Sequence, residues 1–283
     1  MRIVTSAADL LAAGRPSGAT ALVMTMGALH DGHAQLMRAA RRDVSDGGAV
    51  IVSIFVNPTQ FAPGEDFERY PRSLDDDLEL CEAAGVDLVL TPSVEEVYGH
   101  ADGMAVEAVT VDPGPLGNIL EGVTRKGHFR GVLTVVHKVM SMTAADAAYF
   151  GEKDYQQLIL IRRMARDLNM AVRVVGRPTV READGLALSS RNRYLSPEER
   201  TIATTVPHAL ETVAASLGGG VEVAVAAGRE VVAATAGIAL EYLEVTDSEL
   251  GTPPSRGSAR ALIAVRIGST RLIDNVPCWL GRA

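Results

Sequence analysis

Two histidines three residues apart are the first residues whose types and spacing could support chemistry. The segment TMGALHDGH (25–33) contains His30 and His33, and the apolar run ATALVMT (19–25) precedes it. If a strand ends and a helix begins here, residues i and i+3 share one helical face, and the N–H groups of the helix N-terminus favour an anion. We therefore expect both imidazoles to add donors at a phosphate-binding site.

Two other interpretations of the histidine pair remain open. One histidine could cap the helix while the other lies at the surface, with no ligand involved. A metal site is less favoured, because the spacing departs from His-Glu-x-x-His and no third ligand stands out. The remaining histidines are His100, His128, His137 and His208.

Two further polar segments carry groups that suit a nucleotide. In GEKD (151–154), Lys153 could meet a phosphate as a point charge, and Asp154 could accept from ribose hydroxyls or simply cap a helix. The segment LSSRNR (188–193) offers hydroxyls, guanidinium groups and backbone N–H groups. Forked arginines match phosphate oxygens, so this segment suits a triphosphate, although taken without its context a polar turn is the simpler interpretation.

Neutral amides and a run of carboxylates complete the candidate residues. Gln60 and Gln157 follow separate apolar runs and could bind hydroxyls and a carboxylate without adding charge. Taken singly, each is more simply explained as a structural residue. In SLDDD (73–77), the serine and the aspartates would stabilise the start of a helix. Magnesium binding by Asp76 or Asp77 is the alternative.

These residues must be positioned by elements that alternate along the chain. Apolar runs typical of buried strands lie at 19–25, 49–56, 86–91, 147–150 and 171–175. Helical patterns lie at 32–44, 73–85, 130–142 and 154–169. This alternation predicts an α/β fold, with a Rossmann-like doubly wound parallel sheet over residues 1–176. Ligands bind outside the carboxyl ends of such strands, so the polar segments should meet at one edge.

The remainder of the chain, 177–283, predicts a smaller α+β domain. Residues 200–238 are rich in Ala and Val and predict helices. Strands are expected at 241–247 and across 259–275, where a hairpin turns at Gly268–Ser269.

Composition narrows the functional class. Lys and Arg number 27 against 35 Asp and Glu, a net charge of −8, which disfavours a nucleic-acid partner. The two cysteines, Cys81 and Cys278, form no disulfide framework. No signal-peptide core or run of about 18 apolar residues is present, so we expect a cytoplasmic protein without a membrane partner. Walker A and Gly-x-Gly-x-x-Gly motifs are also missing, which disfavours a kinase or a dinucleotide oxidoreductase.

Taken together, the motifs resemble those of the pantoate–β-alanine ligase family, whose TMGALHDGH segment is a version of the HIGH signature of nucleotidylyl transferases. The resemblance also rests on SIFVNPTQF, YPRSLDDDLELCEAAGVD, FGEKDYQQ, PTVREADGLALSSRNRYLS and RLIDN. It covers residues 19–276 and is weakest across 200–240. It implies ATP-dependent condensation of (R)-pantoate with β-alanine to pantothenate, through a pantoyl adenylate, with release of AMP and pyrophosphate. It also implies Mg²⁺, a cytoplasmic homodimer and a C-terminal domain that closes over the site.

The resemblance assigns roles to matching positions. His33 corresponds to the catalytic proton donor, and His30, Lys153 and Arg191 would act with it on the phosphates. Gln60 and Gln157 would hold pantoate, with Asn57 and Tyr70 near the substrate and Asp76 and Asp77 near the metal. The positions implied for ATP binding are Met26, Gly27, Ala28, Leu29, His30, Asp31, Gly32, His33, Gly151, Glu152, Lys153, Asp154, Val180, Leu188, Ser189, Ser190 and Arg191.

The sequence departs from the family at two positions and leaves two other functions open. Met24 stands where Pro is usual, and Leu188 where Met is common; both replacements are apolar. A different nucleotidylyl transferase would need a second basic site for a phosphorylated acceptor, whereas paired glutamines suit a hydroxy acid. A nucleotide-sensing protein without turnover would not need both histidines with Lys153 and Arg191.

Overall fold

The computed structural model describes residues 1–62, 64–99 and 109–281, so His100 lies outside the described residues. Its contacts divide the chain into two units. The first unit comprises Met1–Gly151 and Gln156–Arg177, and the second comprises Glu152–Tyr155 and Pro178–Ala283. The boundary expected between residues 176 and 177 stays a prediction, and the four-residue segment after Gly151 belongs by its contacts to the second unit.

A parallel sheet forms the centre of the first unit, as predicted, and it has six strands where the sequence indicated five. Its spatial order is β1-β4-β3-β2-β5-β6, and neighbouring strands run parallel throughout. The strands are β1 (Arg2–Val4), β2 (Thr20–Thr25), β3 (Ala49–Ile54), β4 (Leu88–Leu90), β5 (Ala147–Gly151) and β6 (Arg173–Arg177). The sequence interpretation missed β1, a three-residue edge strand with a single buried side chain.

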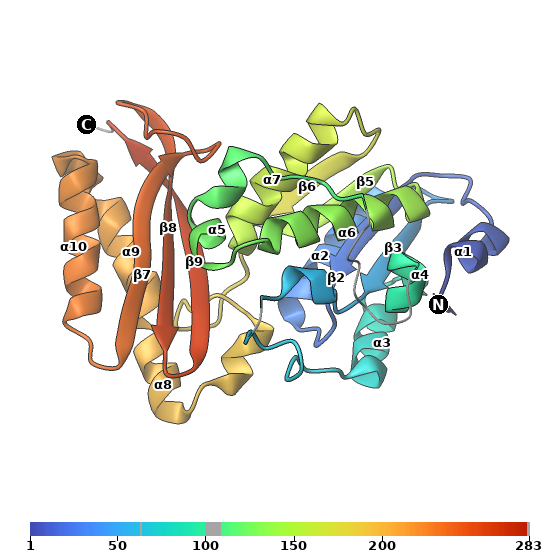
Figure 1. Ribbon diagram of the computed structural model, residues 1–283, viewed down its shortest axis with the longest axis horizontal. Coiled ribbons are helices and arrows are strands. Elements are labelled where there is room, and N and C mark those ends of the chain that lie inside the picture. The colour runs from blue at the N-terminus through green and yellow to red at the C-terminus, as the bar shows by residue number, and fades with distance from the viewer. Residues whose placement is uncertain (63, 100–108, 282–283) are drawn as a thin grey trace. The chain divides into compact units, whose positions relative to one another are not determined.

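Helices cover both faces of this sheet, because alternate residues of each buried strand point to opposite sides. Ala21 and Val23 of β2 pack in the apolar cluster that includes α2 and α3, whereas Leu22 packs in the cluster that includes α6 and α7. Figure 1 shows α6 lying across the sheet. The helices and 3-10 turns are α1 (Ala7–Ala13), α2 (Asp31–Asp43), η1 (Pro58–Gln60), α3 (Leu74–Ala83), α4 (Val94–Tyr98), η2 (Pro115–Asn118), α5 (Glu121–Thr124), α6 (His128–Thr143) and α7 (Tyr155–Asp167).

The strand order reverses at β2, which makes this fold doubly wound. The chain proceeds from β2 to β3 and β4 on one side, then crosses to β5 and β6 on the other. Because β2 pairs directly with β5, with Val23 opposite Tyr149, these two strands end beside each other. Ligands bind at this reversal in open α/β sheets. The histidine segment follows β2, and Gly151 closes β5.

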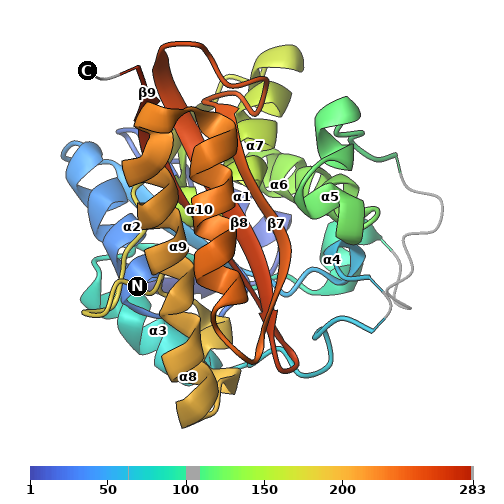
Figure 2. The ribbon, with the colours of Figure 1, turned by 90° about the vertical axis from the view of Figure 1, so that its left-hand side faces the viewer.

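The second unit is the expected smaller α+β domain. Its antiparallel sheet has the order β7-β8-β9, and the predicted hairpin at Gly268–Ser269 joins β8 to β9, with Gly268 at φ +54. Figure 2 shows α9 and α10 lying against one face of this sheet. The elements are η3 (Glu152–Asp154), η4 (Ser190–Tyr194), α8 (Pro197–Ala203), α9 (Thr205–Ser216), η5 (Leu217–Gly219), α10 (Val221–Ala233), β7 (Ile238–Asp247), β8 (Gly257–Ile267) and β9 (Thr270–Leu280).

No helix within the described residues is both long and apolar enough to cross a membrane.

Candidate active site

The loop between β2 and α2 adopts a conformation that few residues tolerate. Gly27 has φ +82 and Ala28 has φ +50, so two successive residues lie in the left-handed region. Thr25 begins the turn, because its hydroxyl donates to the Ser53 carbonyl (3.0 Å) and accepts from the Gly27 N–H (3.3 Å). A Cβ atom at position 27 would approach Asp77 Oδ2 to 2.9 Å, so glycine is needed for both conformation and space.

Asp77 holds this loop from the first turn of α3. Its side chain is buried, Oδ2 accepts from the Ala28 N–H (3.0 Å), and Oδ1 accepts from the Leu29 N–H (2.7 Å). Burial raises the pKa of Asp77, while the two backbone bonds oppose that rise. Both carboxylate oxygens therefore orient the loop that leads to the histidines.

The metal assignment of Asp76 and Asp77 stays a prediction. Asp76 is exposed, whereas the oxygens of Asp77 are already bonded to backbone N–H groups. Across residues 1–62, 64–99 and 109–281, no group of three or more His, Cys, Asp or Glu side chains is placed to hold a metal ion. The geometry thus favours a loop-holding role for Asp77.

The two histidines meet at the start of α2. His30 is the residue before the helix, its carbonyl accepts from the His33 N–H (2.8 Å), and the ring centroids lie 4.1 Å apart. The His30 N–H in turn donates to His33 Nδ1 (3.3 Å). A neutral imidazole carries one proton, so His33 carries it on Nε2. The capping contact considered from the sequence is present, and it fixes the tautomer that makes Nε2 a donor.

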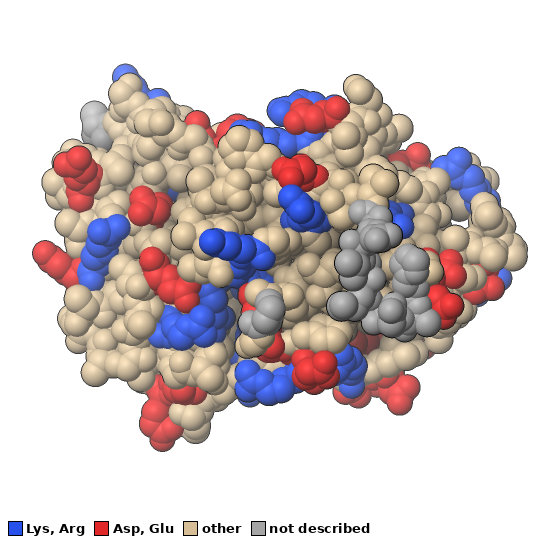
Figure 3. All heavy atoms as spheres, in the orientation of Figure 1, with Lys and Arg blue, Asp and Glu red and all other residues tan. Residues whose placement is uncertain are grey.

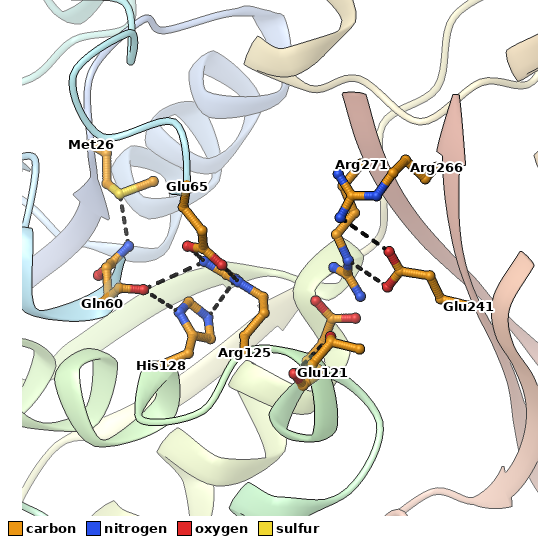
Figure 4. A network of polar contacts seen from close by, with 10 residues as sticks. Met26, Gln60, Glu65, Glu121, Arg125, His128, Glu241, Arg266 and Arg271 are labelled. Atoms are coloured by element: carbon orange, nitrogen blue, oxygen red, sulfur yellow. Dashed lines mark hydrogen bonds and ion pairs between the residues drawn. The ribbon is translucent and has the colours of Figure 1, made fainter. Parts of the chain in front are cut away.

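Gln60 is held by two neighbours, of which Met26 is labelled in Figure 4. Its Nε2 donates to Met26 Sδ (2.8 Å), and its Oε1 accepts from Asn57 Nδ2 (3.2 Å). Asn57 is itself buried and accepts from the Tyr98 hydroxyl (2.7 Å), so it positions Gln60 from below the surface. The expected contact between Asn57 and the substrate stays a prediction. The expected substrate contact of Tyr70 also stays a prediction, and this side chain is buried edge-on against Phe61 with ring centroids 6.1 Å apart.

A buried histidine fixes the backbone beneath Gln60. His128 Nδ1 lies 2.7 Å from the Gln60 carbonyl, and Arg125 Nη1 lies 2.9 Å from His128 Nε2. Because a guanidinium only donates, Nε2 accepts, and Nδ1 carries the proton that it donates to Gln60. Burial lowers the pKa of His128 to about 4, and the neighbouring Arg125 contributes to the same shift. Glu65 completes the group with two bonds to Arg125, at 2.7 and 2.8 Å.

The sequence interpretation missed this role of His128. It named His128 only among the histidines in which no third metal ligand stood out, and it gave this residue no role. The contact to Gln60 joins positions 68 residues apart. No local spacing signals such a contact.

Two adjacent glutamines of α7 differ in their surroundings. Gln156 is buried, where it accepts from the Glu121 N–H (3.0 Å) and donates to the Leu116 and Ile119 carbonyls (both 2.8 Å). Gln157 is half-buried and projects about 100° further round the helix. Gln156 therefore supports the fold, and Gln157 remains the predicted substrate residue.

The candidate residues at 152–154, 180 and 188–191 lie in the second unit, whereas Asp31, Gly32 and Gly151 belong to the first. Lys153 Nζ is 3.7 Å from Asp154 Oδ2, and Glu152 pairs with Arg260 of β8 at 2.9 Å. The Val180 carbonyl accepts from the Leu188 N–H (2.9 Å), so a short hairpin brings these two positions together.

The same hairpin leads into the segment that contains Arg191. Ser189 Oγ accepts from the Arg191 N–H (3.3 Å) at the start of η4. The structure therefore groups the second unit's candidates into two segments, 152–154 and 180–191. The contacts of these two segments with ATP stay predictions.

Figure 3 shows acidic and basic side chains intermingled on the drawn face.

Comparison with known proteins identifies the family. The family described as pantoate-beta-alanine ligase matches residues 2–277. A pantothenate synthetase of a Nocardioides species is 53% identical over 282 residues, covering 97% of this chain and 83% of the relative. One from Saccharopolyspora erythraea is 54% identical over 260 residues, covering 92% of this chain and 84% of the relative.

Solved structures agree with the sequence comparison. A pantothenate synthetase from Thermus thermophilus superposes with a TM-score of 0.90 at 46% identity, covering 98% of this chain and 99% of that one. A pantoate-beta-alanine ligase from Francisella tularensis, complexed with beta-gamma ATP and beta-alanine, gives a TM-score of 0.80 at 32% identity, covering 98% and 97%. The fold, the motifs and these matches together show that this chain belongs to the pantoate–β-alanine ligase family and is an enzyme of the ligase class.

Proposed function

We propose that this ligase uses ATP to condense (R)-pantoate with β-alanine to pantothenate through a pantoyl adenylate, releasing AMP and pyrophosphate. The observation that carries the proposal is the histidine pair at the start of α2, where a backbone bond fixes the donor tautomer of His33. The Francisella ligase complexed with beta-gamma ATP and beta-alanine supports both co-substrates.

The first proposed step needs donors more than a nucleophilic side chain. A pantoate carboxylate oxygen attacks the α-phosphorus of ATP, a P–O bond forms, and pyrophosphate leaves with the electrons of the broken P–O bond. Charge collects on the phosphate oxygens during this transfer. His30, His33 and the backbone N–H groups at the start of α2 would stabilise it, with Lys153 and Arg191 at the phosphates.

The second proposed step uses the activated acyl group. The neutral amine of β-alanine attacks the acyl carbon, and AMP leaves with the electrons of the broken C–O bond. The amide nitrogen then gives up its extra proton. The chain's part is to hold the adenylate in place: Gln60 and Gln157 would bind pantoate through hydrogen bonds, which fix orientation without adding charge beside the reacting carboxylate.

We extend the proposal to Mg²⁺ as a companion of ATP. Mg²⁺ is usually held by one or two carboxylates together with substrate phosphates, so a dedicated cluster of protein ligands is not required. The exposed carboxylate of Asp76 fits such a site, whereas Asp77 is engaged by the loop. When bound, the ion would neutralise phosphate charge.

We also propose that the protein acts as a homodimer in the cytoplasm, without nucleic-acid or membrane partners. The family resemblance supports the dimer. Light scattering coupled to size-exclusion chromatography tests it, and a single species at the mass of one chain would contradict it.

Exchange of labelled pyrophosphate into ATP tests the reaction. Exchange should require pantoate and Mg²⁺ and should proceed without β-alanine, because only the first step returns pyrophosphate. Other hydroxy acids and phosphorylated acceptors, supplied singly, serve as controls. Exchange that depends on β-alanine would overturn the adenylate order, and exchange with a phosphorylated acceptor alone would indicate a different nucleotidylyl transferase.

A further inference from the structure

Two adjacent polar residues of β9 are buried in the second unit. Asp274 is 3% exposed and Asn275 is 2% exposed. Burying an aspartate and an asparagine is costly unless their polar atoms are hydrogen-bonded. Their partners therefore show what these residues hold in place.

Asn275 is hydrogen-bonded to the turn that contains Lys153. Its Nδ2 donates to two successive carbonyls, those of Glu152 (2.9 Å) and Lys153 (2.8 Å), which uses both amide protons. Its Oδ1 accepts from Arg260 Nε (2.7 Å). The same guanidinium donates to Glu152 Oε2 (2.9 Å) and lies 4.0 Å from the centre of the Tyr155 ring. The turn 152–155 is thus held at two backbone carbonyls, at the carboxylate of Glu152 and at the ring of Tyr155.

Asp274 forms an ion pair with the hairpin that follows Val180. Arg181 forms a forked pair with its carboxylate, at 2.6 Å to Oδ2 and 3.0 Å to Oδ1. Arg181 also donates to the Gly185 carbonyl (2.9 Å) and the Asn275 carbonyl (3.2 Å). Through its bridge to Ala187, the residue before Leu188, Arg181 sets where the segment 188–191 begins.

We propose that Asp274 and Asn275 are positioning residues that hold the turn 152–155 and the hairpin 180–188 in fixed register, so that both segments receive ATP together. This inference rests on the proposed function, in which those segments bind the nucleotide. Adjacent residues of one strand set the spacing between the two segments, although both lie about 90 residues or more away in sequence. Ordering the site before binding lowers the entropic cost of placing the triphosphate.

Asn275→Asp tests the two hydrogen bonds from Asn275 to the turn 152–155. The substitution keeps the volume and the acceptor for Arg260 but replaces both N–H donors with an oxygen that faces two carbonyls. We expect the KM for ATP to rise at least about tenfold, with little change in the KM for pantoate. Hydrogen exchange should increase across 152–155. Val265→Ala, in the apolar core of the same sheet, is the control for lost stability and should leave the ratio of the two KM values unchanged.

Arg181→Lys tests the ion pair between Arg181 and Asp274. The Arg181 side chain is partly exposed, so the substitution should leave the protein folded. The lysine keeps the charge but loses the fork, so exchange should increase across 181–191 and not across 152–155. The KM for ATP should again rise selectively. A folded Asn275→Asp or Arg181→Lys protein with the wild-type KM for ATP would overturn the inference, as would equal rises in both KM values.

Hydrogen exchange keeps this inference separable from the proposed function. If the wild-type protein showed no pantoate-dependent pyrophosphate exchange, the function would fail. The positioning role would still be tested, because protection of 152–155 and 181–191 should require about tenfold or more ATP in the variants than in the wild type. Equal protection by ATP in wild type and variants would refute the positioning role.

Discussion

Replacing Asp77 by asparagine separates the loop-holding role of this residue from the alternative of metal binding. The carboxylate accepts from two successive N–H groups, those of Ala28 and Leu29, and is buried. Asparagine has nearly the same volume but keeps only one acceptor oxygen. Its NH₂ group would face a backbone N–H, so one of the two bonds is lost and two donors oppose each other.

The expected loss follows from these contacts. One hydrogen bond to a buried charged group contributes about 1.5–3 kcal/mol. Ala28 lies at φ +50, a conformation that costs a non-glycine residue roughly 1–2 kcal/mol, so the loop relaxes once the restraint weakens. Removing a buried charge offsets part of the loss. We expect the free energy of unfolding to fall by about 2 kcal/mol and adenylation to slow by about 10²-fold, because a displacement of about 1 Å at the histidines is enough for that.

Urea unfolding and single-turnover adenylation at several Mg²⁺ concentrations measure both effects. Asp76→Asn is the matched control, since its exposed position predicts a stability change within about 0.5 kcal/mol. A loop role leaves the half-saturating Mg²⁺ concentration of Asp77→Asn unchanged. Unaltered stability together with a raised Mg²⁺ requirement in Asp77→Asn would refute this reasoning and assign Asp77 to the metal.

Three further predictions concern single side chains. The pKa of His128 is lowered from 6.5 to about 4, so the unfolded chain binds the extra proton first, and stability should fall by about 3 kcal/mol as pH drops from 6.5 to 4. His128→Asn, which can keep the donor to the Gln60 carbonyl, should flatten this slope in pH-dependent melts; an unchanged slope would count against a neutral buried His128. His33→Ala should slow single-turnover adenylation by about 10²–10³-fold with ATP binding retained, and a wild-type rate would remove its proposed role. Gln157→Ala should raise the KM for pantoate about tenfold or more while sparing ATP; the reverse result would reassign the residue.

The alternation of apolar runs and helical patterns was enough to predict the doubly wound sheet. Buried parallel strands are nearly continuous apolar runs, and the connections between them are usually helices. Both can therefore be recognised from short stretches of sequence. The hairpin at Gly268–Ser269 was predictable for a similar reason, because a two-residue turn needs positive φ at its glycine. Strand β1 was missed because three residues are too few to show a period.

The candidate site was predictable where the chain itself carries the groups in sequence, as in the segment from Gly27 to His33. Its supports were not predictable. The local pattern around Asp77 indicates the start of a helix, yet its side chain holds Ala28 and Leu29 from 48 or more positions away. His128 likewise reaches the Gln60 carbonyl across 68 positions.

The motif RLIDN shows the same division. Its residues matched the family, but no local pattern assigned a role to Asp274 or Asn275. Only the folded chain brings Asn275 to the carbonyls of Glu152 and Lys153, more than 120 positions earlier. The sequence alone determined the order of strands and helices and the groups available for chemistry, because periodicity and turn propensity act over short range. Tertiary structure alone decided which polar groups are buried against one another, because those contacts depend on where distant strands end.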